Sequence, residues 1–162
     1  MSRLDSAIRR LEAQRAAIDH AAQLIKNVPG PVLELGLGNG RTYDHLRLRL
    51  PHRHIYAFDR QVAAHPDCIP AAPYLLLGDF NDTLKQARGM LPEPAALAHC
   101  DTGTGDETAS QALAAAIAPL IRPLLAPGAV IISDQPMMLT GSSPVPLPEG
   151  IATGRIFLWR CA

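Results

Sequence analysis

The stretch Val32-Leu33-Glu34-Leu35-Gly36-Leu37-Gly38-Asn39-Gly40-Arg41-Thr42 decides the fold. It reads as a short apolar strand that contains an acid, followed by three glycines at alternate positions and a helix predicted over 41–50. Glycines between a strand and a helix let a ligand approach the backbone where side chains would block it. The spacing is neither the G-x-G-x-x-G of dinucleotide binders nor a phosphate loop ending in Gly-Lys-Ser/Thr. A carboxylate beside such a loop favours a cationic ligand, because no phosphate is there to repel it.

The composition limits the class of the protein and its partners. Of 162 residues 48% are hydrophobic, and the formal net charge is zero, which predicts one domain over 1–162 with a real core. A neutral chain has no global basic field, so we expect no nucleic-acid or membrane partner. No segment is long and apolar enough to span a bilayer, and the cysteines show no disulfide or zinc spacing, so we expect a cytoplasmic protein. The histidines show no metal-ligand pattern, and no metal site is predicted.

The N-terminal segment 3–27 has the pattern of an amphipathic helix. Leu4, Ile8, Leu11 and Ile18 fall near one stripe, with charged residues elsewhere. Pro29-Gly30-Pro31 ends the helix. Two interpretations remain open: the helix packs on its own domain, or it serves as a homodimer contact or a lid over the ligand.

Short apolar strands alternate with helical segments along the rest of the chain, which predicts parallel strands joined by right-handed crossovers. A last strand follows a proline-rich loop too short for a crossover helix, so we expect it to be antiparallel. The predicted strands are 32–35, 55–58, 74–77, 95–99, 129–133 and 155–160, and the helices are 41–50, 83–91 and 107–125, with Pro119 and Pro123 expected to kink or break the last. The expected fold is α/β: a Rossmann-like, doubly wound, mostly parallel sheet of about six strands, with helices on both faces and an extra N-terminal helix before the core at 32–162.

An acid lies in or just after each of the five parallel strands. Asp is a common turn and helix-capping residue, so one such acid is weak evidence. Five in phase should line the carboxyl edge of the sheet, where open α/β sheets bind ligands. These acids are Glu34, Asp59, Asp79, Asp101 and Asp134.

The order of these motifs resembles that of a known superfamily. Glu34-Leu-Gly-Leu-Gly-Asn-Gly40 is followed by Ala57-Phe58-Asp59-Arg60 and then by Leu77-Gly78-Asp79-Phe80. Together with Leu124-Leu-Ala-Pro-Gly-Ala-Val-Ile131, they make the chain similar to the class I S-adenosylmethionine-dependent methyltransferases, in particular the small single-domain bacterial members.

The resemblance implies cofactor-binding roles for the first motif and the second. Glu34 and the backbone around Gly36, Gly38 and Gly40 would hold the amino-acid end of S-adenosylmethionine, since its ammonium needs a charged acceptor. Asp59 would accept from both ribose hydroxyls, at the spacing expected for a ribose-binding acid on the second strand. Its neighbour Arg60 is included in the predicted cofactor site.

The third motif would hold adenine. Asp79 would accept from the adenine amino group, while the backbone of Phe80 donates to the ring and its side chain packs on the ring face. Capping of the following helix is the alternative role for Asp79, and core packing is the alternative for Phe80.

The fourth strand points toward the methyl acceptor. His99-Cys100-Asp101-Thr102-Gly103-Thr104 replaces the Asn/Asp-Pro-Pro-Tyr of members that methylate amino groups of nucleic acids and proteins. Asp101 is the candidate catalytic residue, which would orient the acceptor or take its proton, with a turn or cap as the alternative. His99 is either a base or a packed, hydrogen-bonded histidine, and the second is favoured.

Methyl transfer from a sulfonium needs orientation and a dry site, and it needs no covalent nucleophile. We therefore predict an S-adenosylmethionine-dependent methyltransferase that acts on a small-molecule acceptor. The alternative is a protein that binds S-adenosylmethionine or S-adenosylhomocysteine without catalysis. An NAD-dependent oxidoreductase is a third hypothesis, which the glycine spacing opposes.

Overall fold

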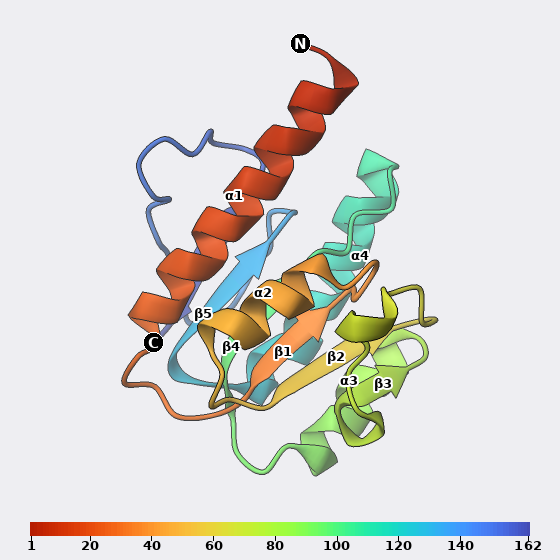
Figure 1. The fold of residues 1–162 in the computed structure, drawn as a ribbon. Helices are drawn as coiled ribbons and strands as arrows, with labels where there is room; N and C mark the ends of the chain where they lie inside the picture. The colour runs from red at the N-terminus through yellow and green to blue at the C-terminus, as the bar shows by residue number, and fades with distance from the viewer.

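The computed structural model describes residues 1–162, and it contains one seven-stranded sheet with strand order β3-β2-β1-β4-β5-β7-β6. Strands β1 to β5 are labelled in Figure 1. Strands β1 to β5 are parallel, and β7 is antiparallel to both β5 and β6. The mostly parallel sheet and the antiparallel last strand are as predicted from the sequence. The strands are β1 (Val32–Leu35), β2 (Ile55–Asp59), β3 (Leu75–Leu77), β4 (Ala95–Cys100), β5 (Leu125–Ser133), β6 (Ser142–Pro144) and β7 (Phe157–Cys161).

Helices cover both faces of the sheet, so the fold is doubly wound. One layer holds α1 (Arg3–Leu24) and α2 (Arg41–Arg49), which pack on each other. The opposite layer holds α3 (Phe80–Met90) and α4 (Glu107–Ile121), which also pack together (Figure 1). Short 3-10 turns lie at Pro66–Cys68, Ala72–Tyr74 and Arg122–Leu124. None of the helices combines the length and the apolar character that crossing a membrane requires.

The structure corrects the number of strands from six to seven. The additional strand β6 has three residues, is mostly exposed and includes Pro144, so it lacks the apolar run by which a strand is recognised. It forms the edge of the sheet and pairs only with β7. An edge strand that is short and contains proline resists pairing with another chain.

Several element bounds also differ from the predicted ones. Strand β5 begins at Leu125 and not at 129, because the strand continues through an irregular stretch where its register with β4 shifts. Gly128 lies in that stretch with a φ of +78°. Helix α4 runs through Pro119 and changes to a 3-10 turn that contains Pro123.

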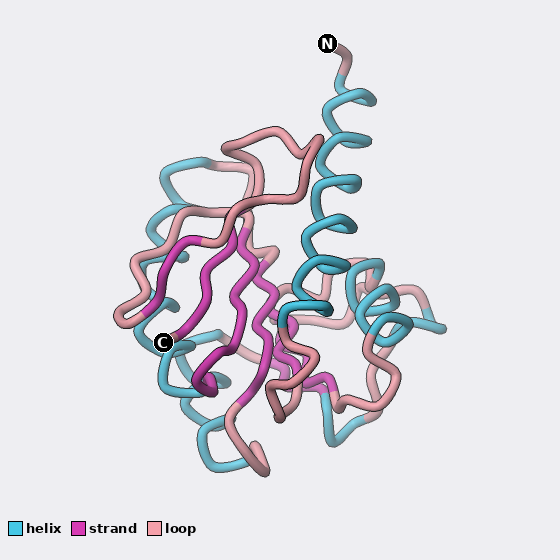
Figure 2. Tube along the Cα trace, turned by 90° about the vertical axis from the view of Figure 1, so that its left-hand side faces the viewer, coloured by secondary structure: helices cyan, strands magenta, loops and turns pink.

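Only the second half of α1 is buried. The helix begins with a capping box in which Ser2 and Asp5 satisfy each other's backbone N–H groups. Its first turns extend away from the sheet (Figures 1 and 2), and Leu4 and Ile8 are exposed there. Five residues of the second half are buried: Ala13, Gln14, Ala17, Ile18 and Ala21.

Candidate functional site

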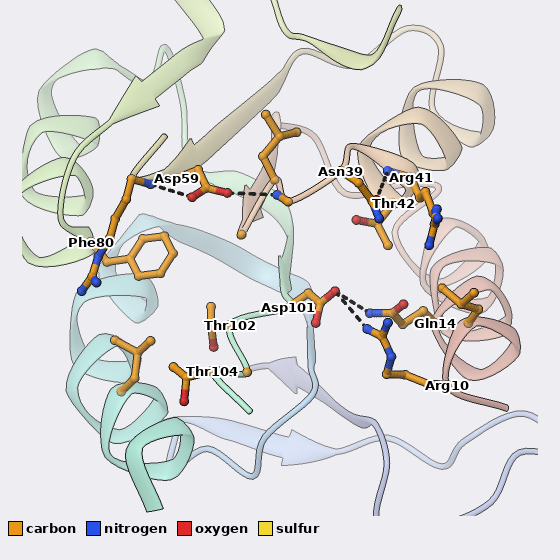
Figure 3. A pocket seen from close by; sticks show the side chains of 17 residues that line it. Arg10, Gln14, Asn39, Arg41, Thr42, Asp59, Phe80, Asp101, Thr102 and Thr104 are labelled. Carbon is orange, nitrogen blue, oxygen red and sulfur yellow. Dashed lines mark hydrogen bonds and ion pairs between the residues drawn. The ribbon is translucent and has the colours of Figure 1, made fainter. Parts of the chain in front are cut away.

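A cavity of about 420 Å³ lies at the carboxyl ends of the central strands (Figure 3). Its walls come from α1, from the glycine loop between β1 and α2, from the ends of β2 and β4, and from α3 and α4. This is the edge at which open α/β sheets bind their ligands, and the volume is within the range of small-molecule sites.

The glycine loop is shaped by close contacts that exclude side chains. Gly36 has a φ of +88°, and a Cβ added there would lie 2.1 Å from the backbone oxygen of Asp101. Gly40 has a φ of +85°, and its Cβ would lie 2.5 Å from the Cβ of Cys68. Gly38 has open space where a Cβ would be and lines the cavity. The loop therefore presents backbone to the cavity while its two ends are packed against the rest of the domain.

Asp59 is oriented by the same loop. Its carboxylate accepts from the backbone N–H of Gly38 at 2.9 Å and from that of Arg60 at 2.6 Å, as Figure 3 shows. Both Asp59 and Arg60, for which the sequence predicts cofactor binding, line the cavity. A carboxylate fixed by two amides keeps further lone pairs with which to accept from hydroxyl groups.

Glu34 lies beneath the loop and not in the cavity wall. Its side chain is fully buried; it accepts a hydrogen bond from the Thr42 hydroxyl, and its Oε2 lies 2.7 Å from Nδ1 of His99. Thr42 does line the cavity. The acid therefore reaches the cavity through Thr42, and His99 is the hydrogen-bonded histidine that the sequence favoured over a catalytic base.

Glu34 also affects the pKa of His99. Burial by itself would lower the pKa of His99, but the charge and hydrogen bond of Glu34 outweigh it, with smaller contributions from Asp101 and Asp134, so the pKa of His99 is raised. Glu34 and His99 therefore form a buried, hydrogen-bonded pair on neighbouring strands, at partner positions in the β1–β4 register.

Asp79 and Phe80, at the start of α3, have different positions: Asp79 caps the helix and Phe80 lines the cavity. Asp79 is the N-cap of α3, and one of its carboxylate oxygens accepts from the backbone N–H of Asn81 at 2.9 Å. This oxygen therefore has the capping role that was the alternative predicted from the sequence. The other oxygen of Asp79 lies 3.5 Å from the exposed guanidinium of Arg60. Phe80 lines the cavity, where Figure 3 shows its ring on the same side as Asp59.

Asp101 lines the cavity from the end of β4, and α1 holds it. The side-chain amide of Gln14 donates to Asp101 Oδ2 at 2.8 Å, and the Arg10 guanidinium lies 3.8 Å from the same oxygen (Figure 3). Neither α1 residue was predicted from the sequence. The available signal was a polar residue, Gln14, on the apolar stripe between Leu11 and Ile18.

Asp134 anchors the loop after β4. It accepts from the backbone N–H of Thr102 at 3.2 Å and from that of Gly103 at 2.8 Å. Burial raises the pKa of Asp134, and the charge of Asp101 adds to this effect. Asp134 is absent from the cavity wall, so its role is to fix the backbone that carries the cavity residues Thr102 and Gly103.

The loop after β4 also contributes two threonines to the cavity wall. The Thr104 hydroxyl is hydrogen-bonded to the backbone oxygen of Asp106 and to the Ser110 hydroxyl. The Thr102 hydroxyl is buried and has no hydrogen-bond partner. It is the only buried side-chain nitrogen or oxygen atom that lacks a partner. No group of three or more His, Cys, Asp and Glu side chains is arranged to hold a metal ion.

Known proteins are similar to this chain in architecture and in sequence. The model of a family described as S-adenosyl-L-methionine methyltransferase matches residues 1–161. The crystal structure of an S-adenosyl-L-methionine methyl transferase from Silicibacter pomeroyi is similar to this chain at 42% identity and a TM-score of 0.95, covering 100% of this chain and 99% of the other. No curated protein matches the chain.

More distant structures are similar in fold alone. TrmN from Thermus thermophilus has 17% identity and a TM-score of 0.60, over 90% of this chain and 48% of its own. The plantazolicin methyltransferase BpumL, in a complex with a triazolic desmethylPZN analog and SAH, has 14% identity and a TM-score of 0.54, over 78% of this chain and 46% of its own. The family match spans the glycine loop and every acid of the site, and the chain therefore belongs to the S-adenosyl-L-methionine methyltransferase family, as an enzyme of the class I fold that uses S-adenosylmethionine.

Proposed function

We propose that this enzyme methylates a small-molecule acceptor, which binds in the cavity beside Asp101 and α1. The observation that carries the proposal is the position of Asp101 in a cavity of about 420 Å³, where Gln14 and Arg10 hold one of its oxygens. Beyond the sheet and its four α-helices, the chain has little structure from which to build a surface for a macromolecule. The formal net charge of zero also offers no general attraction for nucleic acid.

The residues of the cavity fit the cofactor of the family. S-adenosylmethionine supplies an activated methyl group on a sulfonium, and the protein binds and orients it. Asp59 is fixed so that it accepts from ribose hydroxyls, and the Phe80 ring offers an apolar surface for adenine. We propose that Arg60 and Asp79 complete this end.

The other end of the cofactor lies at the glycine loop in this proposal. Gly36, Gly38 and Gly40 let the amino-acid part approach the backbone. Glu34 supports this end through Thr42, because its own carboxylate is buried beneath the loop. Residues 1–162 act as one cofactor-binding domain in this proposal, since all seven strands share one sheet.

Asp59→Ala tests the ribose end. The variant removes an acceptor for the ribose hydroxyls and also frees the amides of Gly38 and Arg60. We expect it to weaken S-adenosylhomocysteine binding by about 1.5–3 kcal/mol, the scale of hydrogen bonds to charged groups. Isothermal titration calorimetry checks this, and an affinity equal to that of the wild type would remove Asp59 from the cofactor site.

Asp101→Asn tests the acceptor end. Both neighbours of Asp101 are donors, so the carboxylate offers its remaining lone pairs to an acceptor O–H or N–H. The asparagine variant is expected to lower methyl transfer by roughly 10²-fold or more, the scale for a positioned acid or base, with S-adenosylhomocysteine affinity retained.

In the assay, the enzyme is incubated with methyl-labelled S-adenosylmethionine and a cell extract, and the products are then separated by molecular mass. The proposal expects label in the low-mass fraction with the wild type and much less with Asp101→Asn. Label that appears only on RNA or protein would contradict a small-molecule acceptor.

The exposed first turns of α1 favour a contact with another protein molecule. Leu4 and Ile8 are exposed, and they lie on the same face of α1 because they are four residues apart. The first turns of this helix extend from the domain (Figure 2). We propose that they contact a second copy of the chain, which sedimentation equilibrium would detect as twice the mass of 17.4 kDa.

A further inference from the structure

A second cavity, of about 330 Å³, lies between α1 and α2, and all of its walls come from these two helices. We call it the helix groove. It adjoins the cavity that contains Asp101, because four residues line both: Leu11, Gln14, Arg41 and Thr42. No residue from the end of a strand lines the helix groove, so it lies outside the proposed cofactor site.

The first cavity has room for one ligand. Small-molecule sites measure about 300–1,000 Å³, so a cavity of about 420 Å³ holds the cofactor and little more. In the proposed function, the group to be methylated meets Asp101, on the side where Gln14 and Arg10 extend from α1 (Figure 3). The rest of the acceptor therefore needs space beyond this cavity, and the helix groove adjoins it on the same side.

The walls of the helix groove combine apolar and cationic side chains. Leu11 and Ile18 supply apolar surface. Arg15 and Arg41 supply two positive charges, and Glu12 is the one acid in the wall. The balance favours a ligand that has an apolar body and a single negative charge.

The two arginines have no anionic partner within the protein. Neither the Arg15 nor the Arg41 guanidinium takes part in an ion pair. In Figure 3 the Arg41 side chain points from the start of α2 toward α1. His45 also lines the groove, but it is already hydrogen-bonded to Asp19 at 2.8 Å. Because a guanidinium fork matches the two oxygens of a carboxylate, the free arginines suit a carboxylate group.

We propose that the methyl acceptor is an apolar carboxylic acid that extends from Asp101 into the helix groove. Its hydroxyl or amino group meets Asp101, its apolar body lies on Leu11 and Ile18, and its carboxylate binds Arg15 and Arg41. This inference rests on the proposed function and names the substrate class of that site. The carboxylate is bound and not methylated, so the product keeps its negative charge.

Anion exchange at pH 7 tests the charge of the product. The wild-type enzyme is incubated with methyl-labelled S-adenosylmethionine and a cell extract, and the low-mass fraction is passed over an anion-exchange resin. The unreacted cofactor is a cation and passes through, whereas the labelled product is expected to be retained. Retention should survive treatment with a phosphatase, because the charge belongs to a carboxylate.

Arg15→Gln tests the helix groove, since Arg15 lines this groove and not the first cavity. With the retained acceptor isolated from the extract, the variant is expected to raise KM roughly tenfold, the scale of a hydrogen bond to a charged group. Its affinity for S-adenosylhomocysteine, measured by calorimetry, should stay within about twofold of the wild type. Arg9→Gln is the matched control, because it removes the same charge from α1 at an exposed position that lines neither cavity.

The outcomes that overturn the inference can be told apart from failure of the proposed function. A labelled low-mass product that passes through the resin, or that loses its retention after phosphatase treatment, overturns the carboxylic acid alone. A KM in Arg15→Gln equal to that of Arg9→Gln overturns the groove as its site. A low-mass fraction without label overturns the small-molecule acceptor, and the inference with it.

Discussion

Replacing His99 by leucine should lower the free energy of unfolding by about 3–5 kcal/mol, the cost of removing one partner from a buried ion pair. The substitution leaves the Glu34 carboxylate fully buried beside Thr42 without its imidazole partner. Urea denaturation followed through the fluorescence of Trp159, the single tryptophan, measures the change. The corresponding fall in melting temperature is roughly 6–20 °C for a chain of this size.

The double variant Glu34→Leu with His99→Leu is the matched control. Because it removes both charges, it should recover much of the stability that the single variant loses. A double variant as unstable as His99→Leu would show that packing, and not the unpaired charge, causes the loss.

The same pair predicts a dependence of stability on pH. The pKa of His99 is raised from its ordinary 6.5, so its contribution is complete below pH 6.5 and is lost as the pH rises through the folded-state pKa. The wild type should therefore lose stability relative to the double variant on the alkaline side of pH 6.5. Parallel curves for the two proteins would contradict a protonated His99.

Gly36→Ala is the second substitution with a large expected effect. The new Cβ would be placed 2.1 Å from the Asp101 backbone oxygen, in a residue with a φ of +88°. The left-handed backbone costs about 1–2 kcal/mol and overpacking about 1–3 kcal/mol. We expect a loss of about 2–5 kcal/mol in unfolding free energy from these two effects together, and weaker binding of S-adenosylhomocysteine, because the loop and the end of β4 must move apart.

Gly105→Ala separates the two causes. Gly105 has nearly the same φ, +87°, but nothing lies within 4 Å of its added Cβ. This control should therefore show only the backbone cost, about 1–2 kcal/mol. Equal losses in the two variants would mean that the contact with Asp101 relaxes without cost.

The sequence predicted the half of the site that is local in the chain. The glycines after β1 and the acid that ends β2 follow from spacing along consecutive strands, and both Gly38 and Asp59 lie in the cavity wall. Periodicity also predicted the parallel strands, because strands buried on two faces leave a continuous apolar run. Strand β6 was missed because its three residues carry no such run.

The position of an acid at the end of each of five strands predicted that these acids lie at the carboxyl edge of the sheet. It did not predict the direction in which each side chain points. Asp59 and Asp101 line the cavity, whereas Glu34, Asp79 and Asp134 do not. Glu34 is hydrogen-bonded to His99, Asp79 caps α3, and Asp134 fixes the loop after β4. Which role an acid takes depends on neighbours distant in the chain, such as the bond between Gln14 and Asp101, and spacing along one strand does not show these neighbours.

The partial burial of α1 connects the end of the helix to the site. Arg10 lies on the exposed half of α1, before the first buried residue Ala13, so core packing does not hold it near Asp101. Helix formation in those turns depends instead on the capping box at Ser2 and Asp5. Fraying of the first turns would withdraw the guanidinium and leave Gln14 alone on the acid. In the proposed function, the N-terminal cap therefore influences, from a distance, the charge around Asp101 that the acceptor would meet.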